Sequence, residues 1–166
     1  KDIFMKGVNW IPMDAIYSRI TTSRYIKLLQ SVTDANMNMV RIWGGGIYEN
    51  EAFYDTCDRL GILIWHDLMF ACSTYPSEEW FLKSVEKELK YQLLRLKSHP
   101  SIALWCGNNE DLGALTWYEE SIKNRDRYVM DYDRLNEGVC GRLVRELDPS
   151  RVFWPSSPCA GPGDFS

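Results

Sequence analysis

The sequence predicts an α/β fold with a parallel sheet, of the kind that forms about the first half, strands 1 to 5, of a (β/α)8 TIM barrel. Short apolar runs alternate with longer segments whose apolar residues recur every three or four positions, which is typical of strands alternating with helices. The run 62–65 is apolar at every position, as in a parallel strand that is covered on both faces. Polar and aromatic residues follow every apolar run, which favours a barrel over an open doubly wound sheet with a single switch point.

The apolar runs give the expected strands in order. These are 3–9, 39–43, 62–65, 102–106 and 152–154. A complete barrel of this type needs roughly 250 residues. The chain has 166 residues, begins with Lys1 and enters a strand-like segment almost at once. We therefore expect residues 1–166 to be a single partial domain, the N-terminal half of a barrel, cut from a longer protein.

Four helices are expected between these strands. Hydroxyl side chains at 21–23 can cap a first helix that runs to about residue 35. A second helix at 51–60 ends before Gly61, which suits a left-handed C-terminal cap. Ser77 is expected to cap a long third helix, and the segment 128–147 carries apolar residues at steps of four.

The composition excludes several classes of protein. A net charge of −4 gives no electrostatic case for binding nucleic acid or an anionic membrane. No apolar run approaches the roughly 18 residues of a membrane span, and no targeting segment is recognisable, so we expect a soluble protein whose compartment is not predicted. The five cysteines are an odd number without Cys-x-x-Cys spacing, which favours buried free thiols over disulfides or a metal site.

The strongest candidate for chemistry is the segment 104–110, Leu-Trp-Cys-Gly-Asn-Asn-Glu. An apolar strand here ends in small and polar residues and then in the carboxylate of Glu110. Barrel enzymes place catalytic acids at the carboxyl ends of their strands. Glu110 is therefore predicted to be a general acid/base, and the preceding Asn109 could hydrogen-bond a sugar hydroxyl.

Four blocks together resemble the β-mannosidases of glycoside hydrolase family 2, and the match covers almost the whole chain. The blocks are 6–12 (KGVNWIP), 36–49 (NMNMVRIWGGGIYE), 61–72 (GILIWHDLMFAC) and 105–110 (WCGNNE). His66 stands where the family pattern leads us to expect Gln. The Trp-Gly-Gly-Gly segment at 43–46 is the mannosidase form of its loop.

The resemblance implies a retaining exo-β-mannosidase that removes terminal non-reducing β-linked mannose, without a metal or another cofactor. Such an enzyme uses two carboxyl groups about 5 to 5.5 Å apart. Glu110 would be the acid/base, and the nucleophile would lie on the seventh strand, outside this chain. The isolated chain is therefore expected to be inactive. Its implied partners are a β-mannoside oligosaccharide, the rest of the barrel and accessory β-sandwich domains.

Further site residues are expected at the strand ends. By resemblance, Asn109 holds the substrate 2-hydroxyl, and Arg41, buried in an apolar strand, pairs with a carboxylate near the nucleophile. Trp43 is expected to offer its face to a sugar ring, with core packing as the alternative. Three further residues are candidates for contact with the sugar, and packing within the fold is the alternative role for each. They are Asp67, Trp10 and Trp117.

Two other functions remain open at this point. The chain could be a non-catalytic carbohydrate-binding or scaffold fragment, because half a pocket would remain without the nucleophile. It could also belong to another family 2 exo-glycosidase, such as a glucuronidase or an exo-glucosaminidase.

Overall fold

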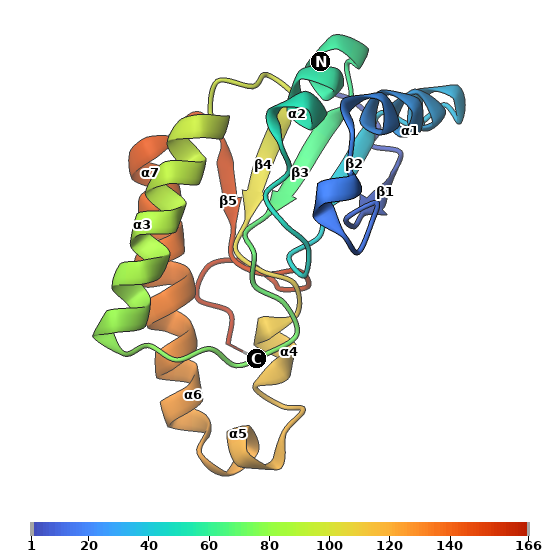
Figure 1. The fold of residues 1–166 in the computed structure, drawn as a ribbon. Coiled ribbons are helices and arrows are strands. Elements are labelled where there is room, and N and C mark those ends of the chain that lie inside the picture. The colour runs from blue at the N-terminus through green and yellow to red at the C-terminus, as the bar shows by residue number, and fades with distance from the viewer. Residues whose placement is uncertain (1, 166) are drawn as a thin grey trace.

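The computed structural model describes residues 2–165, which are built around a five-stranded parallel sheet (Figure 1). The strands are β1 (Gly7–Trp10), β2 (Met39–Ile42), β3 (Leu63–Asp67), β4 (Ile102–Cys106) and β5 (Val152–Trp154). They pair in the order β1-β2-β3-β4-β5, and every neighbouring pair is parallel. The predicted α/β fold with strands in chain order is confirmed, and this is the arrangement of consecutive strands in a (β/α)8 barrel.

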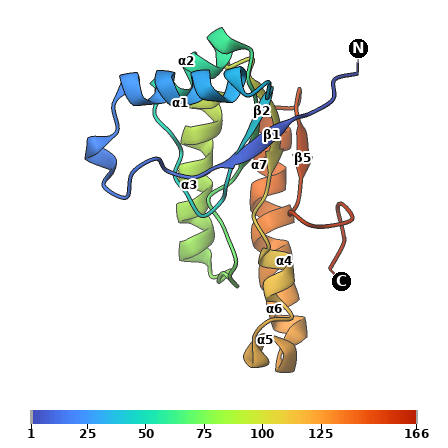
Figure 2. The same cartoon turned by 90° about the vertical axis from the view of Figure 1, so that its right-hand side faces the viewer.

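Helices cover one face of this sheet. They are α1 (Thr22–Asp34), α2 (Glu51–Leu60), α3 (Glu79–Leu96) and α7 (Arg142–Leu147). Each adds buried side chains to one apolar cluster that also contains strand residues, and Figure 2 shows α1, α2 and α3 together on one side of the sheet. Two predicted caps are confirmed. The Thr21 hydroxyl accepts a hydrogen bond from the Arg24 amide at the start of α1, and Gly61 ends α2 in the left-handed conformation, with a φ of 68°. The prediction for Ser77 is wrong, because α3 begins two residues later and the Ser77 hydroxyl donates to Asp131 instead.

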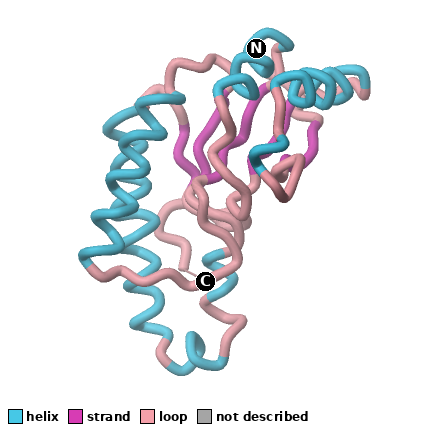
Figure 3. Tube along the Cα trace, in the orientation of Figure 1, coloured by secondary structure: helices cyan, strands magenta, loops and turns pink. Residues whose placement is uncertain are grey.

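The last predicted helix is longer than expected and partly π-helical. It runs through α6 (Arg125–Tyr132), the π-helical η2 (Asp133–Gly141) and α7 without a break. Three short helices were not predicted: η1 (Tyr17–Arg19), α4 (Asp111–Ala114) and α5 (Glu119–Lys123). α4 and α5 lie beyond the carboxyl ends of the strands (Figure 1), where loops also gather (Figure 3).

The strand register decides which side chains face the helices. One row across the sheet consists of Trp10, Ile42, His66, Trp105 and Phe153. All five are buried, and most belong to the apolar cluster under the helices. The preceding row consists of Asn9, Arg41, Trp65, Leu104 and Val152, and none of these is fully buried. Because neighbouring residues of a strand point to opposite faces, the second row lies on the face that no described helix covers.

Two further expectations can be compared with the described residues. The first strand begins at Gly7, not at residue 3, because Ile3, Phe4 and Met5 are exposed and unpaired with β2. All five cysteines are free thiols, as predicted, and three of them, Cys57, Cys106 and Cys140, are buried. Among residues 2–165, no helix combines the length and apolar character needed to cross a membrane.

Candidate active site

The carboxyl ends of β2, β3 and β4 bring the predicted polar residues to one edge of the sheet. Asp67 is the last residue of β3, and Asn109 and Glu110 follow β4. Parallel bridges from Ala71 to Asn109 and from Asn109 to Ser157 continue the strand pairing beyond the regular sheet. The loops after β3, β4 and β5 are therefore held together by backbone pairing, which gives their side chains fixed positions.

An ion pair between the partly buried Arg41 and the fully buried Asp67 connects β2 to β3. Arg41 donates from Nε to Asp67 Oδ1 at 3.2 Å and from Nη2 to Asp67 Oδ2 at 2.8 Å, which is the bidentate geometry of a strong charge-assisted pair. The same carboxylate accepts from Trp65 Nε1 at 2.8 Å and from the Gly44 amide at 3.0 Å. The Asp67 side chain is 0% exposed. Burial raises the pKa of Asp67, and the hydrogen bonds and charge of Arg41 oppose that rise. Asp67 thus anchors Arg41 and presents no surface to solvent.

The Arg41 guanidinium also fixes the orientation of Asn109. Arg41 Nη2 donates to Asn109 Oδ1 at 2.9 Å. The amide nitrogen of Asn109 must then point the other way, and it lies 3.3 Å from both Glu110 Oε2 and Cys72 Sγ. A continuous series of hydrogen bonds therefore runs from Asp67 through Arg41 and Asn109 to the Glu110 carboxylate.

The backbone at Glu110 adopts a conformation that is rare for a residue with a side chain. Its φ is 64°, and Cys72, whose thiol contacts the Glu110 carboxylate, has a φ of 55°. A non-glycine residue in this region costs on the order of 1–3 kcal/mol and persists only where the surroundings enforce it. The Glu110 amide donates to the Ser157 carbonyl at 3.1 Å, and the Cys72 amide donates to the Asn109 carbonyl at 2.7 Å. These bonds hold both side chains toward each other.

The loop after β2 carries the Trp43 ring and joins this network through the Gly44 amide. An added Cβ at Gly44 would lie 2.3 Å from the Phe70 carbonyl oxygen, so only glycine lets this loop approach closely enough for its amide to reach Asp67. An added Cβ at Gly45 would lie 2.0 Å from carbons of the Trp43 ring. The ring thus rests against Gly45, and the side chain is only partly buried.

Two of the predicted tryptophans lie elsewhere. Trp10 is 5% exposed and packs on Phe53 with ring centroids 4.8 Å apart, on the helix side of the sheet, while its Nε1 donates to Glu49. This position corresponds to the packing alternative. Trp117 follows α4, is 48% exposed and has its ring against Gly113. It is not hydrogen-bonded to the Asp67–Arg41–Asn109–Glu110 series.

Three residues near the site were not singled out from the sequence. Trp65 bonds Asp67, Cys72 bonds Glu110, and the Tyr118 hydroxyl donates to the Cys72 carbonyl at 3.2 Å. The alternation of β3 could have indicated Trp65, since it shares a face with Asp67. Nothing local in the sequence indicates the other two contacts, because they join segments far apart in the chain.

Both histidines have structural environments. His66 is buried, contacts the Tyr54 hydroxyl through Nε2 at 2.9 Å, and burial lowers its pKa to about 4. His99 lies between Asp58 and Glu51, at 2.7 and 3.1 Å, and these carboxylates raise its pKa although burial opposes the rise.

One group of possible metal ligands converges among residues 2–165. It consists of Asp55, Asp58 and His99, with ligand atoms within 4.8 Å of one another. His99 is already engaged by carboxylates that favour its protonated form, which cannot coordinate a metal. The group also lies at the amino end of the sheet, before β3 and β4, away from Glu110.

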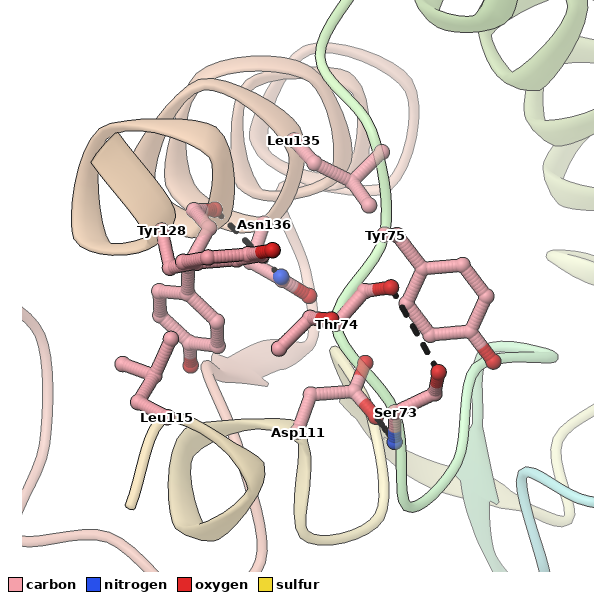
Figure 4. A pocket seen from close by; sticks show the side chains of 9 residues that line it. Ser73, Thr74, Tyr75, Asp111, Leu115, Tyr128, Leu135 and Asn136 are labelled. Atoms are coloured by element: carbon pink, nitrogen blue, oxygen red, sulfur yellow. Dashed lines mark hydrogen bonds between the residues drawn. The ribbon is translucent and has the colours of Figure 1, made fainter. Parts of the chain in front are cut away.

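Asp111, directly after Glu110, is a buried carboxyl group beside a small cavity. The volume within which the centre of a water molecule can lie is about 10 Å³. The cavity is lined by residues of the loop after β3, of α4 and the residues that follow it, and of the α6–η2 helix (Figure 4). Asp111 is 2% exposed, its Oδ1 accepts from the Ser73 amide at 3.4 Å, and its Oδ2 has no partner among the described residues. Burial raises the pKa of Asp111 to about 8. The group is therefore mostly a neutral acid at pH 7.

Asp111→Asn is expected to stabilise the protein in a pH-dependent way. The pKa of Asp111 is about 4 in the unfolded protein and about 8 in the folded one. The unfolded chain therefore gives up this proton at a lower pH than the folded protein, and the free energy of unfolding falls as pH rises from about 4 to about 8. An amide of the same shape does not titrate, so the advantage of the variant should grow by about 1.4 kcal/mol per pH unit across this window. Thermal unfolding of the two proteins at pH 4.5, 6 and 7.5 measures it.

The matched control for this prediction is Asp126→Asn, which changes an exposed carboxylate on α6. Its melting temperature should follow that of the unsubstituted protein at all three pH values. If the difference in melting temperature between Asp111→Asn and the unsubstituted protein is the same at all three pH values, Asp111 is not a neutral acid in the folded protein.

Comparison with known proteins finds β-mannosidases among the proteins similar to this chain. No family model matches the chain. The β-mannosidase of Mus musculus is 50% identical over 161 residues, which are 96% of this chain and 18% of that protein. The structure of a β-D-mannosidase from Dictyoglomus thermophilum superimposes with a TM-score of 0.78 at 45% identity and covers 94% of this chain and 19% of that one.

A more distant structure agrees in fold alone. Bacteroides uniformis β-glucuronidase 2 superimposes with a TM-score of 0.70 at 22% identity, over 90% of this chain and 17% of that one. The chain spans about a fifth of the length of the relatives that it matches. At 45–50% identity over nearly all of its own residues, the chain is similar to one segment of these β-mannosidases, which confirms the predicted resemblance to the β-mannosidases of glycoside hydrolase family 2.

Proposed function

We propose that the chain is the N-terminal half of the catalytic barrel of a retaining exo-β-mannosidase, and that Glu110 is its acid/base. The observation that carries the proposal is the series of hydrogen bonds from Asp67 to Glu110 at the carboxyl ends of β3 and β4. Barrel enzymes build their sites at this end of the sheet. The relatives at 45–50% identity are named β-mannosidases, which supports mannose as the sugar.

In the first step of the proposed reaction, a carboxylate nucleophile attacks the anomeric carbon of the terminal mannose. Glu110 gives its proton to the glycosidic oxygen as the bond to the leaving sugar breaks. In the second step, the Glu110 carboxylate takes a proton from water, and the hydroxide so formed attacks the anomeric carbon and releases the nucleophile. Glu110 ends the cycle protonated, as it began.

The other site residues hold the sugar or the acid/base in place. Asn109 is proposed to meet the 2-hydroxyl by exchanging one of its two long bonds, at 3.3 Å, for a bond to the sugar. Trp43 offers the ring face that Gly45 does not cover. Asp67 acts through Arg41, because its own carboxylate is buried and fully hydrogen-bonded. The burial of Trp10 favours a packing role for it, whereas the half-exposed Trp117 keeps the proposed sugar contact.

The nucleophile is proposed to come from outside residues 1–166. The other two carboxyl groups next to the site, Asp67 and Asp111, are 0% and 2% exposed. Neither can approach an anomeric carbon, and a retaining enzyme needs a second reactive carboxylate about 5 to 5.5 Å from the first.

The isolated chain is therefore expected to show no measurable hydrolysis of an aryl β-mannoside. Release of p-nitrophenol from the β-mannoside by purified residues 1–166 measures this, and adding the remaining part of the barrel in trans should restore turnover. Robust turnover by the chain alone would show that the nucleophile lies within it.

A panel of p-nitrophenyl β-glycosides tests the proposed substrate on the full-length protein. We expect hydrolysis of the mannoside and little of the glucuronide, the glucosaminide or the galactoside. A preference for one of the other sugars would replace mannose in the proposal. No turnover of any of them by the full-length protein would support the carbohydrate-binding alternative.

A further inference from the structure

Within residues 2–165, the Cys72 thiol is the one group from the loop after β3 that hydrogen-bonds the Glu110 carboxylate. Its Sγ lies 3.4 Å from Glu110 Oε2 and 3.3 Å from Asn109 Nδ2. The amide nitrogen can only donate, so the thiol accepts from Asn109 and donates its own hydrogen to Glu110. Cys72, Asn109 and Glu110 thus form a closed triangle of hydrogen bonds.

The backbone is arranged to make this contact. Cys72 and Glu110 both have positive φ values, 55° and 64°, and only one other non-glycine residue among those described, Asn36, shares this conformation. The Cys72 amide bonds the Asn109 carbonyl, and the Tyr118 hydroxyl bonds the Cys72 carbonyl. Two unfavourable backbone conformations that meet at one side-chain contact point to a functional constraint on that contact.

The two oxygens of the Glu110 carboxylate have different surroundings. Oε2 accepts from Cys72 Sγ and from Asn109 Nδ2. Oε1 receives no hydrogen bond from residues 2–165. A proton on Oε2 would have to displace one of the two donors, whereas a proton on Oε1 displaces nothing.

Resting on the role of Glu110 proposed above, we infer that Cys72 is a positioning residue for the acid/base, whose thiol holds Oε2 and leaves Oε1 to carry the transferable proton. Oε1 is then the atom that protonates the leaving oxygen and later accepts a proton from water. Burial and the hydrogen bond to Glu110 raise the pKa of the Cys72 thiol. The thiol therefore keeps its hydrogen and remains a donor through the neutral range.

Other charged and titratable groups around this contact must stay constant in any test of it. They come from the end of β2, the end of β3, the loop after β3, α4 and the segment after α4. These groups are Arg41, Asp67, Tyr75, Asp111 and Tyr118. A change confined to the thiol leaves all five in place.

The experiment is the pH dependence of kcat for Cys72→Ala and Cys72→Ser in the full-length protein. In Cys72→Ala, the Glu110 carboxylate loses a hydrogen-bond donor that stabilises its charged form. The basic limb of the pH profile of this variant should therefore move up by about 0.5 pH unit. A hydroxyl is a stronger donor than a thiol, so Cys72→Ser should keep the basic limb at or below its original position. On an alkyl mannoside, which needs protonation, kcat should fall about 3- to 10-fold in Cys72→Ala and within about twofold in Cys72→Ser.

Cys159→Ala is the matched control, since it removes another partly buried free thiol, one that makes no hydrogen bond to Glu110 among residues 2–165. Its basic limb should coincide with that of the unsubstituted protein. The inference is overturned if the Cys72→Ala limb does not move, or if Cys159→Ala moves it equally. Glu110→Gln in the same assays separates the two proposals: full activity of this variant would overturn both, whereas an inactive variant with an unmoved Cys72→Ala limb would overturn only the role of Cys72.

Discussion

Glu110→Gln is expected to lower kcat of the full-length protein by about 10²–10⁴-fold on substrates with poor leaving groups, which is the usual contribution of a general acid. The amide keeps the shape of the side chain but has no proton of suitable acidity to give. An aryl mannoside with a strongly activated leaving group needs little protonation, so its first step should suffer much less. Steady-state rates on an alkyl and a dinitrophenyl β-mannoside measure the difference.

The control for this prediction is Glu119→Gln in α5, where the carboxylate is exposed and pairs with Lys123. That variant should keep the original rates on both substrates. Equal losses on the two substrates in Glu110→Gln would mean that the residue does not act as the acid.

Arg41→Met is expected to destabilise the protein by about 3–5 kcal/mol, the usual cost of leaving a buried charge without its partner. The Asp67 side chain is 0% exposed, so water cannot replace the two hydrogen bonds from Arg41. Asn109 would also lose the donor that orients its amide. Activity should therefore fall together with the melting temperature.

A double-mutant cycle separates this charge effect from the loss of packing. Asp67→Asn removes the buried charge, so the variant with both substitutions should be more stable than Arg41→Met alone. Melting temperatures of the four proteins measure the coupling. Additive effects of the two substitutions would show that the pair is not energetically coupled.

The alternation of strands and helices could be predicted from the sequence because it depends on local patterns. The run 62–65 and the apolar steps of α3 each indicate their element without reference to the rest of the chain. The short helices α4 and α5 have too few residues to show a periodicity. Ser77 is of a residue type that commonly caps helices, but its hydroxyl donates a hydrogen bond to Asp131, in a helix much later in the chain.

The gathering of Arg41, Asp67, Asn109 and Glu110 at one edge of the sheet could be predicted, but the contacts among them could not. A carboxylate after an apolar strand indicates an active-site edge. The direction of each side chain depends on register, which places Trp10 under the helices and Arg41 on the opposite face. The contact of Cys72 with Glu110 spans 38 positions and needs two left-handed residues, neither of which is glycine. No local pattern encodes such a contact.

The way Trp43 is held has a consequence for the sugar contact proposed for it. The ring rests on Gly45, and the backbone of Trp43 bonds Trp10 and Gly46, whereas the proton-handling groups are tied together through Asp67, Arg41 and Asn109. Under the proposed function, the surface that meets the sugar and the groups that orient Glu110 share an edge of the sheet, and the Gly44 amide joins them through Asp67. Substitution of Trp43 or Gly45 would change the shape offered to a sugar, whereas substitution of Gly44 would also disturb Asp67 and, through it, Arg41 and Asn109.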